Sequence, residues 1–117
     1  MGVVPEKRLS SDARPARIIG ASPTGVRMLY MIVEHFRDGD ALPVYRRFRD
    51  QGRLAPEGLR YVASWVTDDF RRCFQVMECE DPRLLAEWTA RWEDLIEFEV
   101  VPVVTSAEAA AAVAARL

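Results

Sequence analysis

The residue best suited to proton transfer is His35, the only histidine among the 117 residues of the chain. An imidazole with an ordinary pKa of about 6.5 can act as a general base or hydrogen-bond a ligand near neutral pH. The side chain follows Glu34 at the end of an apolar segment, where it can equally cap a strand or bind a turn carbonyl. His35 is therefore a candidate catalytic residue with a structural alternative.

Three aromatic side chains, Tyr30, Tyr61 and Trp65, are candidates for lining a small-molecule pocket. Each combines a large apolar surface with a polar tip, and such tips usually find a partner when they are buried. Packing in the core or at a dimer interface is the alternative role for all three. Trp88 and Trp92, four residues apart, are assigned to the core-facing side of a helix.

Two charged clusters resemble functional sites and have simpler explanations. The basic run Arg46–Arg49, continued by Arg53, resembles an anion-binding patch, but helical spacing gives these residues one face beside Asp50. We interpret that face as solvated. Glu97 and Glu99 alternate onto one side of a strand, where carboxylates keep a sheet edge soluble rather than acting as an acid and base pair.

Cysteine usage and the absence of certain motifs exclude several function classes. Cys73 and Cys79 lie six positions apart in one predicted strand, so their Cα atoms are about 20 Å apart, beyond disulfide reach. We expect two free thiols in a reducing, cytoplasmic setting. The sequence contains no glycine-rich phosphate loop, nucleophile elbow or HExxH motif, and we expect neither a metal nor a cofactor.

The net charge of −2 is unevenly distributed along the chain. Residues 1–27 contain five basic and two acidic side chains, with Pro, Gly and Ser between them, whereas residues 28–117 contain 11 basic and 16 acidic side chains. We interpret residues 1–27 as a flexible extension, and a misassigned start with Met28 as the first residue is the alternative. The acidic remainder does not favour nucleic-acid binding, and no apolar run is long enough to span a membrane. Fifteen Arg against one Lys, with abundant Ala, is typical of a GC-rich bacterial genome.

Apolar periodicity and turn signals divide residues 28–117 into four strands and three helices. Pro102 cannot donate to a ladder and predicts an edge position or a strand end for the last strand. In the second strand, alternation assigns Tyr61 and Trp65 to one face and Val62 and Val66 to the other. The strands are predicted at 28–36, 59–67, 71–79 and 96–104, and the helices at 40–53, 81–95 and 106–116, with Asp40, Asp81 and Ser106 as the capping residues.

This order predicts a ferredoxin-like α+β fold, βαββαβ, over residues 28–105, followed by a C-terminal helix within 106–117. Both long helices then cover one face of a four-stranded antiparallel sheet. The first three strands carry large apolar residues on both faces, so the uncovered face needs a partner. A second copy packed sheet against sheet is the partner we expect, as in a dimeric α+β barrel.

The motifs EHF, APEGL, SWV, RCFQ and FEV, taken together, resemble those of a small uncharacterised bacterial domain family, DUF3303. The resemblance extends from Met28 to about Ala109. It implies a dimeric α+β barrel and brings no established activity or catalytic residues.

Two functions remain open, and a purely structural subunit is a third, less specific possibility. The first is a homodimeric binding or accessory protein for a small organic molecule. The alternative is a cofactor-independent monooxygenase or isomerase in which His35 is the base and Tyr30 or Trp65 positions the substrate, an analogy that rests on fold alone.

Overall fold

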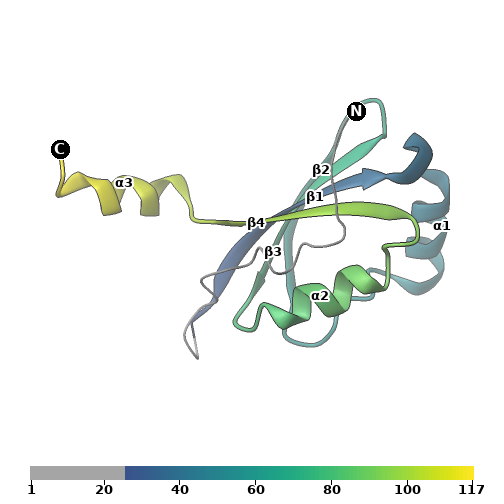
Figure 1. Ribbon diagram of the computed structural model, residues 1–117, viewed down its shortest axis with the longest axis horizontal. Coiled ribbons are helices and arrows are strands. Elements are labelled where there is room, and N and C mark those ends of the chain that lie inside the picture. Colours follow the sequence, from purple (N-terminus) through teal and green to yellow (C-terminus); the bar gives the residue numbers. More distant parts are fainter. Residues whose placement is uncertain (1–25) are drawn as a thin grey trace.

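The computed structural model describes residues 26–117, and Figure 1 shows the arrangement of its elements. Residues 1–25 lie outside the described residues. The predicted flexible extension over 1–27 and the alternative start at Met28 both concern this segment. The elements are β1 (Met28–Phe36), the 3₁₀ turn η2 (Arg37–Gly39), α1 (Leu42–Gln51), β2 (Arg60–Val66), β3 (Arg72–Cys79), α2 (Arg83–Ala90), β4 (Ile96–Val103) and α3 (Ser106–Ala114).

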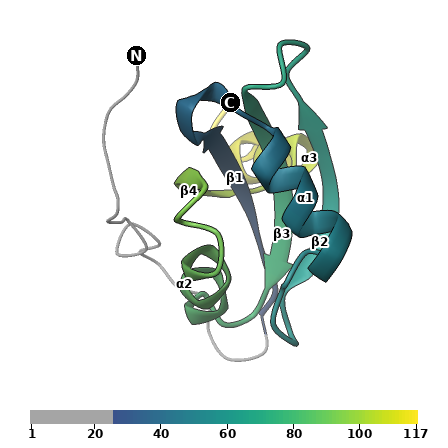
Figure 2. The same ribbon diagram turned by 90° about the vertical axis from the view of Figure 1, so that its right-hand side faces the viewer.

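The four strands form one antiparallel sheet in the order β2-β3-β1-β4. This order and the βαββαβ succession confirm the predicted ferredoxin-like α+β fold. β4 lies at an edge of the sheet, which is one of the two positions that Pro102 predicts. Figure 2 shows the strands in this order with α1 and α2 beside them.

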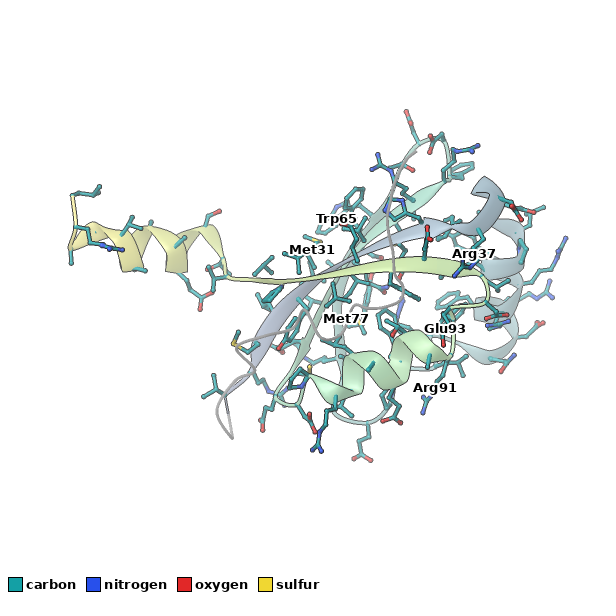
Figure 3. All side chains as sticks on the ribbon, in the orientation of Figure 1. Met31, Arg37, Trp65, Met77, Arg91 and Glu93 are labelled. Atoms are coloured by element: carbon teal, nitrogen blue, oxygen red, sulfur yellow. The ribbon has the colours of Figure 1, made fainter. Side chains whose placement is uncertain are left out.

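The two faces of the sheet have different surroundings. In β1, Tyr30, Ile32, Glu34 and Phe36 are buried, and the residues between them are only half-buried. The buried set packs against both helices, together with Val44 of α1 and Leu85 and Trp88 of α2. Figure 3 shows Met77 on the side of the sheet that faces α2, with Met31 and Trp65 on the other side.

Both long helices begin close to their predicted capping residues and end earlier than predicted. Oδ1 of Asp40 accepts the amide hydrogen of Leu42 at 3.0 Å, and Oδ1 of Asp81 accepts that of Arg83 at 3.0 Å. The predicted end of the second helix at residue 95 is wrong. Beyond Ala90 the backbone tightens into i→i−3 turns, and these still bury Trp92.

The assignment of Tyr61 and Trp65 to one face of β2 is wrong, because the strand contains an irregularity. The register with β3 shifts between Tyr61, which pairs with Met77, and Ala63, which pairs with Val76. A β-bulge of this kind adds one residue and reverses the alternation beyond it. Tyr61 therefore lies on the helix-covered face and Trp65 on the open face.

The C-terminal helix is capped by Thr105 and not by Ser106 as predicted. The Thr105 side chain accepts the amide hydrogen of Glu108, whose carboxylate accepts the amide hydrogen of Thr105 in return. Every residue of α3 is exposed, and Figure 1 shows the helix extending beyond β4, away from α1 and α2. Within residues 26–117, no helix combines the length and apolar character required to cross a membrane.

Candidate functional site

A cavity of about 240 Å³ lies between the sheet and its two covering helices. Phe36, Trp88, Trp92 and Ile96 are buried residues of its apolar wall. This volume is below the range typical of drug-sized ligands, so the cavity matches a small metabolite. The lining residues are Glu34, Phe36, Val44, Tyr45, Phe48, Arg53, Ser64, Val66, Cys73, Gln75, Trp88, Trp92 and Ile96.

The cavity is reached from one side, between α1 and β2. Three of its lining residues are substantially exposed: Tyr45 at 45%, Phe48 at 42% and Val66 at 36%. The first two lie on consecutive turns of α1 and the third ends β2. Two aromatic side chains and a valine therefore form the exposed side of the cavity.

Three polar side chains of the cavity are joined by hydrogen bonds. Nη1 of Arg53 donates to Oε1 of Gln75 at 2.9 Å, and Nε2 of Gln75 donates to Oε2 of Glu34 at 2.6 Å. Glu34 is 6% exposed and Gln75 4% exposed. Within residues 26–117, the second oxygen of Glu34, Oε1, has no hydrogen-bond partner. The carboxyl group thus keeps one oxygen available to a molecule in the cavity.

The pKa of Glu34 is raised from 4.5 to about 7. Burial is the main cause, because a carboxylate loses its hydration in an apolar cavity. The hydrogen bond from Gln75 and the positive charge of Arg53 act in the opposite direction and keep the rise moderate. Glu34 can therefore gain or lose a proton near neutral pH, as a general acid or base requires.

Arg53 is held at the cavity by both its backbone and its side chain. The indole Nε1 atoms of Trp88 and Trp92 both donate to its carbonyl oxygen, at 3.0 and 2.9 Å. The guanidinium carbon lies 3.9 Å from the ring centroid of Tyr61 and 5.2 Å from that of Phe48. The predicted solvated role is therefore wrong for Arg53: α1 ends at Gln51, and the following turn directs this side chain inward.

Gly52 makes this change of direction possible. Its φ of 73° and ψ of −161° fall in a region that only glycine adopts readily. Arg49, by contrast, stays on the exposed face of α1, where Nε donates to Oδ1 of Asp50 at 2.7 Å, as the solvated interpretation of the basic run predicts.

Cys73 also lines the cavity, but its thiol is poorly suited to nucleophilic chemistry. Burial, together with the neighbouring Glu34, raises its pKa to about 12. The thiolate is the reactive form, so this residue remains a protonated, weakly polar wall group at neutral pH. Both cysteines are free and buried, which confirms the predicted absence of a disulfide. Among the described residues, no group of three or more His, Cys, Asp or Glu side chains could hold a metal ion.

None of the four sequence-predicted site residues lines the cavity, and only Tyr61 lies next to it. Tyr61 approaches it through Arg53 and through a 2.8 Å hydrogen bond between its hydroxyl and that of Ser64. Tyr30 is 1% exposed and packed in the core. Trp65 and His35 lie on the open face, where Nε2 of His35 is 3.4 Å from Oε1 of Glu99.

Glu34 and Gln75 were not identified from the sequence, although a signal for both exists, and Arg53 was considered only within a basic run that was interpreted as solvated. Alternation in β1 places Glu34 with the buried Tyr30 and Ile32, and a carboxyl on a buried face is costly unless it has a purpose. The same argument applies to Gln75 in β3. No comparable pattern marks Arg53, because its position depends on the end of α1 and on the conformation of Gly52.

The fold and the cavity define a ferredoxin-like α+β domain with a buried carboxyl between sheet and helices. The chain belongs to the DUF3303 family, described as a domain of unknown function, which it matches over residues 28–117. Comparisons with curated proteins and with solved structures give no match.

Proposed function

We propose that this protein binds a small, largely apolar organic molecule in the cavity between the sheet and its covering helices. The observation that supports this function is that Oε1 of Glu34, in a cavity of about 240 Å³, has no hydrogen-bond partner among residues 26–117. A buried polar atom without a partner costs free energy, and a bound molecule with a hydroxyl or another donor removes that cost. The aromatic wall provides the apolar contact area for such a molecule.

The test is a screen of small cyclic carboxylic acids, phenols and ketones by thermal shift and ligand-observed NMR. Val66→Trp fills the exposed side of the cavity, and Val62→Trp is the matched control, since Val62 is 41% exposed on the same strand and does not line the cavity. We expect compounds that bind the wild type and the Val62 variant but not the Val66 variant. Binding that survives Val66→Trp, or a library without any binder, would contradict the proposal.

We further propose that the protein works as a homodimer through the open face of the sheet. Pairing across the strands places nine apolar side chains on this face. Charged residues surround them, and an apolar patch with a polar rim is typical of an interaction site. The apolar residues are Leu29, Met31, Val33, Ala63, Trp65, Phe74, Val76, Val101 and Val103.

The charges on the open face favour a second copy as its partner. The β2–β3 half carries Arg72 together with the ion pair of Arg60 and Glu78, and is positive overall. The β4 half carries Glu97 and Glu99. A two-fold axis parallel to the strands would place the β4 half of one copy against the β2–β3 half of the other. Opposite charges then face each other twice in a self-complementary interface. Sedimentation equilibrium should show a dimer at micromolar concentration, and a monomer there would contradict this assembly.

The alternative function, a cofactor-independent enzyme, is supported by Glu34 rather than by His35. His35 lies on the open face and does not line the cavity, whereas Glu34 does. Of the two reaction types, isomerisation requires only proton transfer, for which a carboxyl and a nearby cation are suitable groups.

A further inference from the structure

We infer that Glu34 is a general base that moves a proton within a small cyclic carbonyl compound, while Arg53 stabilises the oxygen that becomes negatively charged. The inference rests on the proposed small-molecule site and specifies its substrate class and chemistry. Both groups line the same cavity and are joined through Gln75.

The geometry leaves both groups free to act on a ligand. Glu34 uses only Oε2 in its hydrogen bond with Gln75, and Arg53 uses only Nη1. Within residues 26–117, Oε1 of the carboxyl and Nη2 and Nε of the guanidinium have no hydrogen-bond partner. One side of the cavity therefore offers a proton acceptor, and another offers donors for an anionic oxygen.

The proposed step balances without a further reactant. Oε1 of ionised Glu34 takes a proton from the carbon next to the carbonyl group, and the electron pair of the broken C–H bond moves to the carbonyl oxygen as an enolate. The guanidinium of Arg53 hydrogen-bonds that oxygen. Protonated Glu34 then returns the proton to the same carbon, or to the far carbon of an adjacent double bond, and the second outcome is an isomerisation.

The other residues of the cavity favour this chemistry over the alternatives. Cys73 is held as a thiol, so covalent catalysis by a thiolate is disfavoured. Trp88, Trp92 and Phe36 form flat apolar surfaces suited to a ring. A low-dielectric wall also strengthens the attraction between the guanidinium and an enolate oxygen.

The pH profile should follow the ionisation of Glu34. The polar groups that face it are Tyr45 from α1, Arg53 from the segment after α1, and Cys73 and Gln75 from β3. The lining residues from α2 and the following turn, Trp88 and Trp92, add no charge. Because burial raises the pKa of Glu34 to about 7, the rate should increase with pH and level off above neutrality.

Two probes test the inference on the full chain. Deuterium incorporation into 2-tetralone in D₂O reports proton abstraction, and conversion of cyclohex-3-enone to its conjugated isomer reports proton return. Glu34→Gln should lose about 100-fold or more of the protein-dependent rate. Arg53→Met should lose about 10-fold or more, and Glu34→Asp should retain part of the activity.

His35→Gln is the matched control, because His35 is the neighbouring residue of β1 on the opposite face, and it should leave both rates unchanged. Binding of each probe is measured separately by ligand-observed NMR. Probes that bind in the cavity without protein-dependent proton transfer would overturn the general-base role and leave the proposed binding function intact. If neither probe binds or reacts, the cyclic carbonyl class is overturned, and the library screen with the Val66 variant decides the binding function independently. Rates that survive Glu34→Gln would assign the base elsewhere.

Discussion

The side-chain amide of Gln75 donates a 2.6 Å hydrogen bond to Glu34 on the helix-covered face of the sheet. Both residues are polar and buried, whereas the core around them consists of apolar side chains. The bond partly compensates the cost of burying the carboxyl but satisfies only one of its oxygens. A residual cost of this kind is common at functional sites, where stability is given up for reactivity.

Glu34 should make the protein less stable as the pH rises. The pKa of this carboxyl is about 7 in the folded protein against an ordinary value of 4.5, so between these pH values the folded state holds a proton that the unfolded chain has released. The contribution is fully present below pH 4.5, decreases up to about pH 7 and is absent above it. Its size is on the order of 3 kcal/mol. Glu34→Gln keeps the shape and the acceptor for Gln75, and should be more stable than the wild type at pH 8 but not at pH 4.5.

Urea unfolding at a series of pH values measures this difference. Glu57→Gln is the control, because Glu57 is an exposed carboxylate between α1 and β2 that neither lines the cavity nor lies on the open face, and its replacement should preserve the wild-type dependence. Parallel pH curves for the wild type and Glu34→Gln would show that burial of Glu34 does not determine the pH dependence.

Gly52→Ala should destabilise the protein by about 1–3 kcal/mol through the backbone alone. A Cβ at this position would meet no atom within 4 Å, so no steric contact is involved. The cost arises because alanine disfavours a φ of 73° with a ψ of −161°. Chemical denaturation measures it. Gln51→Ala, one residue earlier on an exposed position, should change stability by less than about 0.5 kcal/mol.

The local periodicity of the sequence predicted the fold well. It did not predict features that depend on an irregularity in a strand or on the exact end of a helix. The strands, their two-sided character and the edge position of Pro102 follow from alternation, turn residues and the missing proline donor. The reversal at β2 depends on a single extra residue near Val62, which no propensity marks. The inward position of Arg53 was missed for a related reason, because it depends on where α1 ends, whereas alternation in β1 and β3 does mark Glu34 and Gln75.

Trp88 and Trp92 should show coupled effects on stability, because they share one acceptor. Each indole donates to the carbonyl oxygen of Arg53, so either single substitution to phenylalanine leaves that oxygen with one partner. Each single variant should lose about 1 kcal/mol from the hydrogen bond, in addition to any packing loss. The double variant leaves a part-buried carbonyl without either indole and should cost about 1–3 kcal/mol more than the sum of the two. A double-mutant cycle in urea measures the coupling, and strict additivity would mean that the shared acceptor is unimportant.

Thr105→Ala should weaken α3 without affecting the rest of the domain. The hydroxyl of Thr105 accepts the amide hydrogen of Glu108 at 3.0 Å, and losing such a cap costs a helix about 0.5–2 kcal/mol. A nine-residue helix is only marginally stable alone, and every residue of α3 is exposed. NMR chemical shifts of residues 106–114 should move toward random-coil values, while the unfolding midpoint stays the same. Ser106→Ala, which removes the residue that the sequence suggested as the cap, should leave the helix intact.

Trp65→Lys should dissociate the proposed dimer. Trp65 is 60% exposed in the described chain and belongs to the apolar part of the open face, so sheet-to-sheet packing would bury it, and a lysine there would be left charged and desolvated. Loss of a large buried aromatic contact should raise the dissociation constant at least about 30-fold, which corresponds to about 2 kcal/mol. Leu42→Lys is the matched control, because Leu42 is also 60% exposed but lies on α1, away from the open face. Sedimentation equilibrium should therefore give a monomer for the Trp65 variant and a dimer for the Leu42 variant. The opposite pattern would place the interface on the helical side, where it would block access to the cavity at Tyr45 and Phe48.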